Sequence, residues 1–431
     1  MGLMTEPTIR DAKRPPDRWP LSFLRSPLNP WRGLSGLPRE IWLLFATNLI
    51  NRAGMMILPF LVLYLTRSLH FSLARAGFVF AVYGATATLA GPIAGKLSDR
   101  IGALPIMRVS LLSSGMALLL YPFARTFPTV VCMTMVWAAC NEMFRPSSLA
   151  AITHVVTAEQ RKPAYALNRL AINLGMSIGP ALGGFLATVS FRAMFGVDAA
   201  TTLIAGAVLS LTTWRLATGG KRAPSSGDDG HIEVKSIFRD RRLAIFLLAS
   251  VMVGIVFFQH ESALPLYMVQ YLGMSPAFYG TLFTVNTLLI VALEVPLNAA
   301  TARWPNTWSL IIGSLLFAIG FGGLAFLSSA AGILTLVVVW TFGEMTLFPA
   351  MAAHLGEVAP PSLRGTYMGA YSMSLSIALT LGPWMGTQLL GATGPVGVWS
   401  VMFALGVLAA ALMVYAAPPH LRRRAAAVAE F

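Results

Sequence analysis

The chain contains twelve apolar stretches that are each long enough to cross a lipid bilayer as a helix, for which about 20 residues suffice. They lie at 41–65, 76–97, 105–124, 128–152, 164–188, 193–216, 243–270, 277–301, 306–328, 330–353, 365–390 and 396–416. Hydrophobic residues make up 56% of the 431 positions and charged residues only 11%, unlike the balance of a soluble domain. Because backbone groups in hydrocarbon must be hydrogen-bonded within the chain, the stretches are predicted to be helices. The expected fold class is an all-α membrane protein with twelve transmembrane helices.

The two halves of the chain repeat each other at a constant spacing of 203 residues. The matched pairs are Gly77 and Gly280, Arg100 and Arg303, Trp137 and Trp340, Pro146 and Pro349, Arg161 and Arg364, Gly179 and Gly382, Pro180 and Pro383, and Gly183 and Gly386. Repeats of this size in an apolar chain are typical of transporters. The sequence therefore predicts two pseudo-symmetric six-helix bundles.

Polar segments divide the chain into five parts. We expect an N-terminal segment at 1–40, bundles at 41–217 and 243–417, a linker at 218–242 and a tail at 418–431. The linker is rich in Gly, Pro, Ser and Asp, a composition that has little to bury. The first 40 residues lack the apolar core of a cleaved signal peptide, so the first helix is expected to be the insertion signal.

The distribution of Lys and Arg predicts the orientation of the chain in the membrane. Of the 31 basic residues, 24 fall in loops on the side of the N-terminus, and only Arg67, Arg75, Arg125 and Arg192 fall in loops on the other side. Since cytoplasmic loops carry the basic excess, both termini are predicted to be cytoplasmic, in a multi-pass protein of the inner membrane. The net charge of +14 lies at membrane boundaries, where it meets lipid headgroups, and does not indicate nucleic-acid binding.

One glycine-rich motif lies on the predicted fifth helix. Gly175, Gly179 and Gly183 are spaced four residues apart, which clears a groove where another helix can approach closely. With Pro180 and Gly184 they resemble motif C of the drug/proton antiporters of the major facilitator superfamily. The resemblance implies antiport, with the motif at the contact between the two halves.

A second motif follows the predicted second helix. Gly95, Asp99, Arg100 and Gly102 resemble motif A of the same superfamily. There the carboxylate caps the positive N-terminus of helix eleven and favours the outward-open state. Asp99 corresponds to Ala302 in the second half, so this latch is expected on one side only.

The runs Asn51-Arg52, Phe144-Arg145-Pro146, Asn168-Arg169 and Asn173-Leu174-Gly175 are similar to the MdtH/LmrP-like branch of multidrug exporters. The resemblance covers residues 41–416. It implies the superfamily fold, a proton-coupled antiporter that mostly acts as a monomer, and a central cavity lined by helices one, four, seven and ten.

Charged side chains inside the predicted spans indicate where transport chemistry takes place, since each costs roughly 2.5–3.5 kcal/mol on insertion scales. Glu344 on helix ten has no basic residue within a turn on its own helix. Low dielectric surroundings favour the protonated form of such a carboxylate. We therefore predict that Glu344 is the principal proton and cation site, with Glu142, tuned by Arg145, as a second.

Alternatives remain for several of these charges. Glu142 and Arg145 are spaced i, i+3 and could form a purely structural ion pair. Arg52 could balance Glu142 or bind an anionic substrate. Arg169 could extend toward the membrane surface, and structural or gating roles are expected for Asp198 and Glu294.

Aromatic and methionine side chains near these charges suit a pliable cavity for bulky apolar cations or amphiphiles. The predicted cavity residues are Arg52, Trp137, Phe144, Phe258, His260, Glu261, Tyr267, Trp340, Met345 and Phe348. Each aromatic residue could equally pack inside a bundle. No metal constellation and no Walker A sequence is present, so we expect no cofactor, no metal site and no ATP-driven step.

The sequence thus predicts a secondary transporter, not an enzyme, that exports hydrophobic or amphiphilic small molecules in exchange for protons by alternating access. Its partners would be that substrate, protons and membrane lipids. The alternatives are the same fold acting as a lipid or lysophospholipid flippase, or as a proton-coupled peptide or metabolite symporter. A membrane sensor or scaffold without transport is a third alternative, which the preserved motifs A and C disfavour.

Overall fold

The computed structural model of the chain describes residues 36–157, 160–212, 214, 240–301, 304–360 and 363–416. The side chains of Asp99, Lys162 and Arg364 lie outside the described part as well. Most of the predicted segments 1–40, 218–242 and 418–431 also lie outside it, so their boundaries stay predictions.

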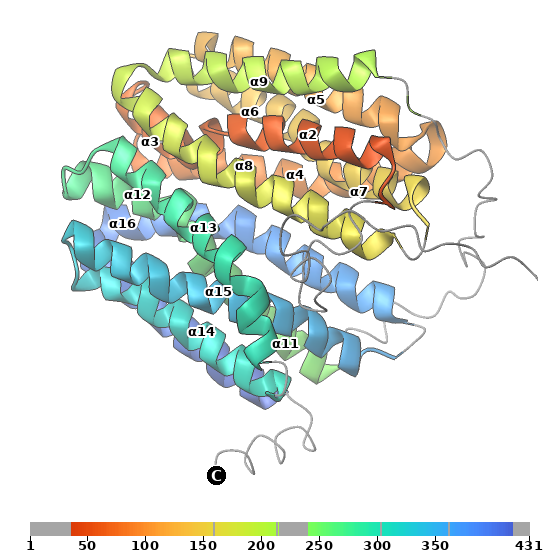
Figure 1. Cartoon of the computed structure of the whole chain (residues 1–431). Coiled ribbons are helices and arrows are strands. Elements are labelled where there is room, and N and C mark those ends of the chain that lie inside the picture. Colours follow the sequence, from red (N-terminus) through yellow and green to blue (C-terminus); the bar gives the residue numbers. More distant parts are fainter. Residues whose placement is uncertain are drawn as a thin grey trace, which may run out of the picture.

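Helices account for nearly all of the described residues, and they fall into two groups (Figure 1). The first group is α2 (Arg39–Gly54), α3 (Ile57–Arg67), α4 (Leu73–Ile101), α5 (Ala103–Leu120), η2 (Tyr121–Phe123), α6 (Phe127–Glu142), α7 (Phe144–Val155), α8 (Arg161–Val189) and α9 (Phe191–Leu211). The second is α11 (Arg241–Phe257), η3 (Phe258–Glu261), α12 (Ala263–Leu266), η4 (Tyr267–Tyr271), α13 (Pro276–Thr301), α14 (Asn306–Gly322), η5 (Gly323–Ala325), α15 (Ala330–Val358) and α16 (Arg364–Ala416). We call them the N-bundle and the C-bundle.

Eleven continuous helical segments in the described chain are long and apolar enough to cross a membrane. The longest, Thr366–Ala416, has 51 residues, and its backbone leaves the helical conformation at Gly394, where φ is 70°. At 1.5 Å per residue it is about 76 Å long, more than twice the thickness of a bilayer core. It therefore contains two spans, and the predicted twelve-helix fold in two bundles is confirmed.

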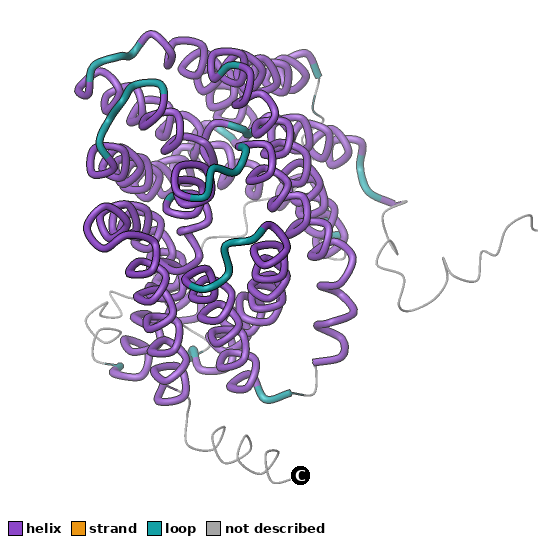
Figure 2. Tube along the Cα trace, turned by 90° about the vertical axis from the view of Figure 1, so that its left-hand side faces the viewer, coloured by secondary structure: helices purple, strands orange, loops and turns teal. Residues whose placement is uncertain are grey.

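The bundles meet along two pairs of helices. Here α8 of the N-bundle packs along α13 of the C-bundle, and α4 packs along α16. Figure 1 shows α8 and α13 side by side at this boundary, and the view turned by 90° in Figure 2 shows the helices of both bundles running in one general direction. Each contact joins one helix of each half, as expected for two repeats that face each other.

Glycine allows the close approach of α4 and α16. A Cβ atom on Gly84 would lie 2.8 Å from Cα of Thr380, and one on Gly77 would lie 3.3 Å from Cα of Trp384. Gly91 lies one heptad further along the same face of α4, and a Cβ there would meet no described atom within 4 Å. The two helices therefore touch over one half of their length and separate over the other.

The helices α8 and α13 diverge in the same direction. A Cβ on Gly184 would lie 3.0 Å from Cα of Ala277, and the hydroxyl of Thr284 donates to the carbonyl of Ser177 (2.6 Å). Further along, the long side chains of Arg169 and Glu294 bridge these two helices. We call the end with the loops at 68–72 and 272–275 the closed end, and the end where α2 and α11 begin the open end.

Candidate functional site

Two helices are interrupted at corresponding positions halfway between the closed end and the open end. In the N-bundle, α2 ends at Gly54 and α3 begins at Ile57. In the C-bundle, α11 ends at Phe257 and passes through the 3-10 turn η3 before α12. Residues 55–56 and 258–259 are 203 positions apart, so each half has the same break. Paired interruptions of this kind are where transporters build substrate and ion sites.

A buried carboxylate stabilises the break in the N-bundle. Asp198 of α9 is 3% exposed and accepts hydrogen bonds from the backbone nitrogens of Met56 and Ile57, both at 3.0 Å. These are free N–H groups at the start of α3, where a negative charge also complements the helix dipole. Asp198 thus holds the second part of the first span in place.

An amide performs the corresponding role in the C-bundle. The side-chain nitrogen of Gln259 donates to the carbonyls of Ile255 (2.9 Å) and Gly382 (2.8 Å). Tyr279 of α13 then links the two breaks, since its hydroxyl lies 2.7 Å from the carbonyl oxygen of His260 and 3.1 Å from that of Pro59. One hydroxyl therefore contacts backbone acceptors of both bundles just to the closed-end side of the breaks.

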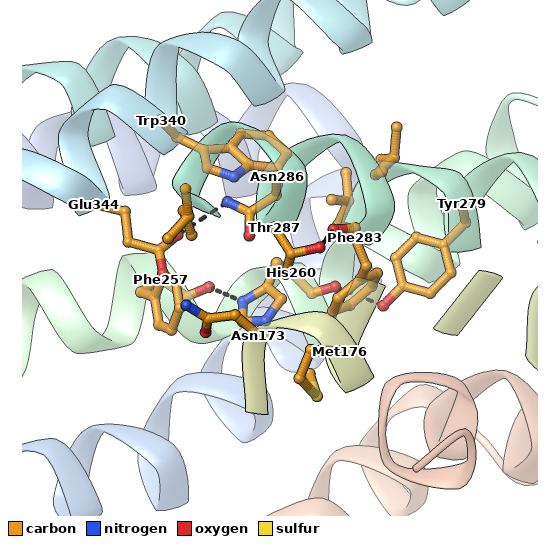
Figure 3. A pocket seen from close by; sticks show the side chains of 13 residues that line it. Asn173, Met176, Phe257, His260, Tyr279, Phe283, Asn286, Thr287, Trp340 and Glu344 are labelled. Atoms are coloured by element: carbon orange, nitrogen blue, oxygen red, sulfur yellow. Dashed lines mark hydrogen bonds between the residues drawn. The ribbon is translucent and has the colours of Figure 1, made fainter. Parts of the chain in front are cut away.

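A cavity of about 140 Å³ lies beside these breaks (Figure 3). Its lining comes mainly from the C-bundle, with two residues of α8. The lining residues are Asn173, Met176, Phe257, His260, Leu264, Tyr279, Leu282, Phe283, Asn286, Thr287, Ile290, Trp340 and Glu344. The cavity is thus an aromatic and aliphatic pocket with one carboxylate.

Neutral groups alone hold the Glu344 carboxylate. Its Oε2 accepts a hydrogen bond of 3.0 Å from the side-chain nitrogen of Asn286, which also lies 2.9 Å from the hydroxyl of Thr341. No basic side chain in the described ranges lies within 4.0 Å of it. This is the environment that the sequence predicted for Glu344, and its role in proton binding stays a prediction.

The N-bundle holds its own carboxylate at the equivalent level. Glu142 Oε1 accepts from the hydroxyl of Tyr83 (2.6 Å) and from the side-chain nitrogen of Asn141 (3.1 Å), which also donates to that hydroxyl (3.0 Å). Tyr83 corresponds to Asn286 and Asn141 corresponds to Glu344 at the spacing of 203 residues. The same two positions are hydrogen-bonded in each half, but only the C-bundle places a carboxylate in the pair.

Glu142 and Arg145 do not form the ion pair that their spacing allowed. They lie on either side of Met143, where α6 ends and α7 begins, and their side chains do not come within 4.0 Å of each other as an ion pair. Arg145 is exposed and has no hydrogen-bond or ionic partner among the described residues. The hydrogen-bond partners of Glu142 are Tyr83 and Asn141, and its tuning by Arg145 stays a prediction.

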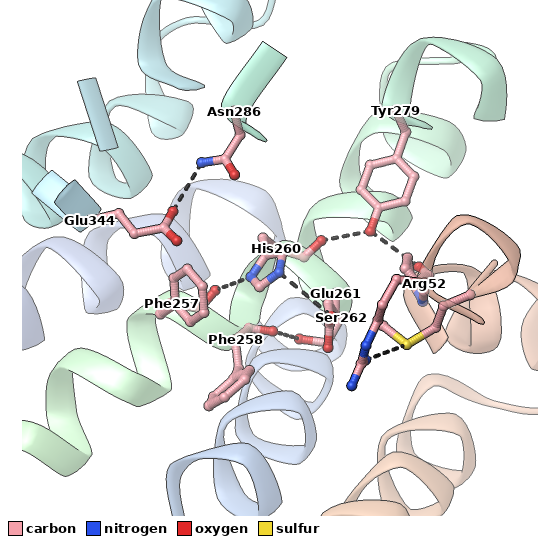
Figure 4. Close-up of polar contacts among 11 residues, drawn as sticks. Arg52, Phe257, Phe258, His260, Glu261, Ser262, Tyr279, Asn286 and Glu344 are labelled. Atoms are coloured by element: carbon pink, nitrogen blue, oxygen red, sulfur yellow. Dashed lines mark hydrogen bonds and ion pairs between the residues drawn. The ribbon is translucent and has the colours of Figure 1, made fainter. Parts of the chain in front are cut away.

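A further polar group is formed by His260 and Glu261 at the break of the C-bundle (Figure 4). His260 Nδ1 is hydrogen-bonded to the carbonyl oxygen of Phe257 (2.6 Å), and its Nε2 lies 3.7 Å from Glu261 Oε1. In this view His260 lies between Glu344 on one side and Arg52 of the N-bundle on the other. Arg52 is within electrostatic reach of Glu142, Arg145 and Glu261 but has no ionic partner within 4.0 Å among the described residues.

The other residues predicted for the cavity divide between its wall and the bundle interiors. His260 and Trp340 line the cavity, and Phe258 and Phe348 are partly buried against the large core cluster. The side chains of Trp137, Phe144, Tyr267 and Met345 are at most 4% exposed. For these four, the packing alternative describes their position, with Phe144 in the N-bundle core beside Ile41 and Met107.

Several lining residues were missed because the sequence argument considered only helices one, four, seven and ten. Asn286, Phe283 and Tyr279 come from α13, and Asn173 comes from α8. One signal could have found Asn286 and Tyr83, since they are polar residues at equivalent positions of both repeats inside apolar spans.

The motif C glycines serve helix packing on two sides. A Cβ on Gly179 would lie 2.8 Å from the carbonyl oxygen of Arg52, and one on Gly183 would lie 2.9 Å from Cβ of Met56. Gly184 faces α13 of the other bundle, and a Cβ on Gly280 would lie 3.1 Å from the carbonyl carbon of Pro180. The motif therefore seats the broken first span on α8 and also forms part of the contact between the bundles.

Motif A lies at the open end, at the junction of α4 and α5. Gly102 has a φ of 92°, a conformation that glycine adopts without strain, and it separates the two helices. Gly95 has free space around it and Arg100 is exposed. The side chains of Asp99 and Arg364 lie outside the described part, so the predicted latch to helix eleven stays a prediction.

Comparison with known proteins agrees with this architecture. A sequence profile described as Major Facilitator Superfamily matches residues 43–275 and 260–430. The uncharacterised MFS-type transporter YqjV of Bacillus subtilis (strain 168) is 26% identical over 388 residues, covering 87% of this chain and 93% of its own. Multidrug resistance protein 1 of the same organism is 28% identical over 363 residues, covering 82% and 90%.

Solved structures share the fold. The crystal structure of a mutant of the peptide transporter POT superposes with a TM-score of 0.74 at 17% identity, covering 91% of this chain and 96% of that one. The matching profile spans both bundles and includes the broken spans and both carboxylate sites. This multi-pass membrane protein belongs to the Major Facilitator Superfamily.

Proposed function

We propose that the protein is a proton-coupled antiporter that exports hydrophobic or amphiphilic small molecules by alternating access. The observation that carries the proposal is Glu344, a carboxylate in an aromatic cavity whose side-chain partner is the neutral Asn286. Such a group binds a proton or a cation, but not both, because protonation removes the charge that attracts the cation. Proton entry would therefore release a cationic substrate.

The shape of the molecule supports alternating access. The bundles touch at the closed end and diverge toward the open end, so this conformation exposes the cavity on one side. We assign the open end to the cytoplasm, since the loops at that end carry most of the Lys and Arg residues. Both termini would then be cytoplasmic, and the protein would take its substrate from inside the cell as a monomer in the inner membrane.

Antiport and multidrug export rest on motif C and on the relatives. The motif C glycines lie where the first span and the two bundles meet, so they are placed to affect the exchange between conformations. A relative named multidrug resistance protein 1 matches over most of its length. We further propose that the chain falls in the MdtH/LmrP-like branch, which its sequence runs resemble, with Glu142 as a second proton site.

The test is proton-driven flux of cationic dyes in proteoliposomes for Glu344→Gln beside Glu357→Gln. Glu357→Gln is the same chemical change on the same helix, α15, but Glu357 is exposed near the end of that helix. We expect Glu344→Gln to lose the response to an imposed pH gradient and Glu357→Gln to keep it. A response that survives Glu344→Gln would refute the assignment of the proton site.

The same assay separates the alternatives. Uptake of peptides or metabolites with the proton gradient would support a symporter, and pH-independent movement of lysophospholipids would support a flippase. Absence of flux for every class would support a sensor or scaffold.

A further inference from the structure

Two cations of the N-bundle, Arg52 and Arg145, have no ionic partner among the described residues. Arg52 lies at the end of α2 and Arg145 at the start of α7, each beside a helix interruption. The two lie within electrostatic reach of each other. Two like charges so placed repel, and the nearby acids Glu142 and Glu261 attract Arg52 without forming a direct ion pair with it.

The partners of Arg52 in the structure are poor ones for a guanidinium. Its Nη1 lies 3.0 Å from the thioether sulfur of Met55, which is a weak acceptor, and its Nε is buried without any hydrogen-bond partner in the described part of the chain. A buried donor left unpaired is destabilising, and more so when it carries charge. The geometry therefore leaves most of the donors of Arg52 available.

The acidic groups near Arg52 are already engaged elsewhere. Glu142 accepts hydrogen bonds from Tyr83 and Asn141, and Glu261 lies beside His260. Neither carboxylate comes within 4.0 Å of either arginine. Within the described ranges, Glu142 and Glu261 thus have partners other than the arginines, and Arg52 and Arg145 have no ionic partner. This arrangement suits a site that receives an anion from outside the chain.

Glu344, Phe257 and Asn286 of the cavity wall lie on the other side of His260 from Arg52 (Figure 4). The aromatic walls of the cavity, which include Phe257, Phe283 and Trp340, suit a hydrocarbon chain or ring. A ligand that reaches from Arg52 into the cavity therefore has one charged end and one apolar end. We propose that Arg52 and Arg145 form an anion subsite that binds the phosphate or carboxylate group of an amphiphilic substrate whose apolar part enters the Glu344 cavity.

This inference rests on the proposed function and narrows its substrate class. A guanidinium offers a planar fork of donors that matches carboxylate and phosphate, so either group fits the same side chains. A substrate that also carries a cation for Glu344 would be a zwitterion. Such a substrate would place its anion at the arginines of the N-bundle and its cation at Glu344 of the C-bundle.

Binding of four probes with the same hexyl chain tests the subsite: hexyl phosphate, hexanoate, hexyltrimethylammonium and hexyl glucoside. Calorimetry with protein in lipid nanodiscs, against empty nanodiscs, gives the affinities. We expect Arg52→Gln and Arg145→Gln each to weaken binding of the anionic probes by about tenfold or more. The neutral glucoside should be unaffected, and Arg52→Lys should retain most of the affinity for anions.

The controls keep the outcome decisive. Arg161→Gln removes an exposed arginine at the start of α8 and should change nothing. Unchanged binding of both anionic probes in both glutamine variants, or an equal loss for the glucoside, would overturn the subsite. If Arg52→Gln does not fold, as judged by gel filtration and thermal unfolding, the result for the exposed Arg145→Gln variant decides alone.

The two anionic probes also identify the anionic group. A loss of binding for hexyl phosphate only would indicate a lipid-like phosphate, and a loss of binding for hexanoate only would indicate a carboxylate.

The effect of Glu344→Gln separates this inference from the proposed function. That variant should keep the affinity for hexyl phosphate while it loses proton-driven flux. If flux persists in Glu344→Gln but the arginine variants still lose the anionic probes, antiport through Glu344 is wrong and the anion subsite stands.

Discussion

The two halves of the molecule use one scaffold for different chemistry. In the N-bundle, Tyr83 and Asn141 are hydrogen-bonded at 3.0 Å, and in the C-bundle the equivalent Asn286 and Glu344 are hydrogen-bonded at 3.0 Å. The donor amide has moved from one helix of the pair to the other. The duplicated frame therefore fixes where a polar pair lies, and the substitution within the pair decides whether that half carries a carboxylate facing the cavity.

The breaks in the first and seventh spans differ in the same way. Asp198 caps the start of α3 with a buried carboxylate, whereas the neutral Gln259 bonds to the carbonyls around the break in the C-bundle. Val401 occupies the position equivalent to Asp198, so the second half has no acid there. An acid thus stabilises the break of the N-bundle, whereas the acid of the C-bundle, Glu344, lines the pocket.

The largest effect is expected when the carboxylate is moved between the halves. Glu344→Asn should lower pH-driven flux in proteoliposomes by about 100-fold, since the group that couples the proton to the substrate is lost. Adding Asn141→Glu should not restore it, because the new carboxylate would lie beside Glu142 and would compete for the hydroxyl of Tyr83.

Asn141→Glu alone serves as the control for damage to the N-bundle. Recovery of flux in the double variant to within a few-fold of the original protein would mean that the halves are interchangeable. The conclusion that the two bundles differ in chemistry, drawn from the pair Asn286 and Glu344, would then be wrong.

A smaller effect is expected from glycines on α4 that lie toward opposite ends of the molecule. Gly84→Ala places a Cβ 2.8 Å from Cα of Thr380, where backbone rather than a flexible side chain must move, while Gly91→Ala meets no described atom within 4 Å. Overpacking typically costs about 1–3 kcal/mol, so Gly84→Ala should shift the population toward a conformation that is open at the closed end.

Spin labels at Ser68 and Ser275, both exposed in the loops of the closed end, report this shift as a longer distance between the bundles. The measurement needs Cys132 and Cys140 replaced by serine, because both are free thiols. We expect longer distances in Gly84→Ala and unchanged distances in Gly91→Ala. Equal distance distributions in Gly84→Ala and Gly91→Ala would contradict the conclusion that one half of α4 packs against α16 while the other half is separated from it.

The sequence sufficed for the fold because the apolar spans and the spacing of 203 residues need no tertiary information. It also located Glu344, since a lone acid in an apolar span is visible in the chain itself. It did not locate the breaks, because the break at Met56 depends on Asp198, which lies 142 residues away. Asn286 and Tyr279 were missed for a related reason, since their position on the cavity wall results from the packing of α8 against α13.

The smallest effect is expected from the ion pair that joins the bundles near the open end. Arg169 of α8 pairs with Glu294 of α13, but the arginine side chain is 61% exposed while the glutamate side chain is 12% exposed. Pairs with an exposed member contribute less than about 1 kcal/mol, so a double-mutant cycle of Arg169→Gln and Glu294→Gln on the spin-label populations should give a coupling below that value. The charge-exchanged variant, Arg169→Glu with Glu294→Arg, should recover most of the coupling energy of the original pair. A coupling of several kcal/mol would instead make the pair a lock that holds the bundles in one state. A weak pair is the better fit to alternating access, because a contact at the end that must open and close in each cycle can favour one conformation without preventing the other.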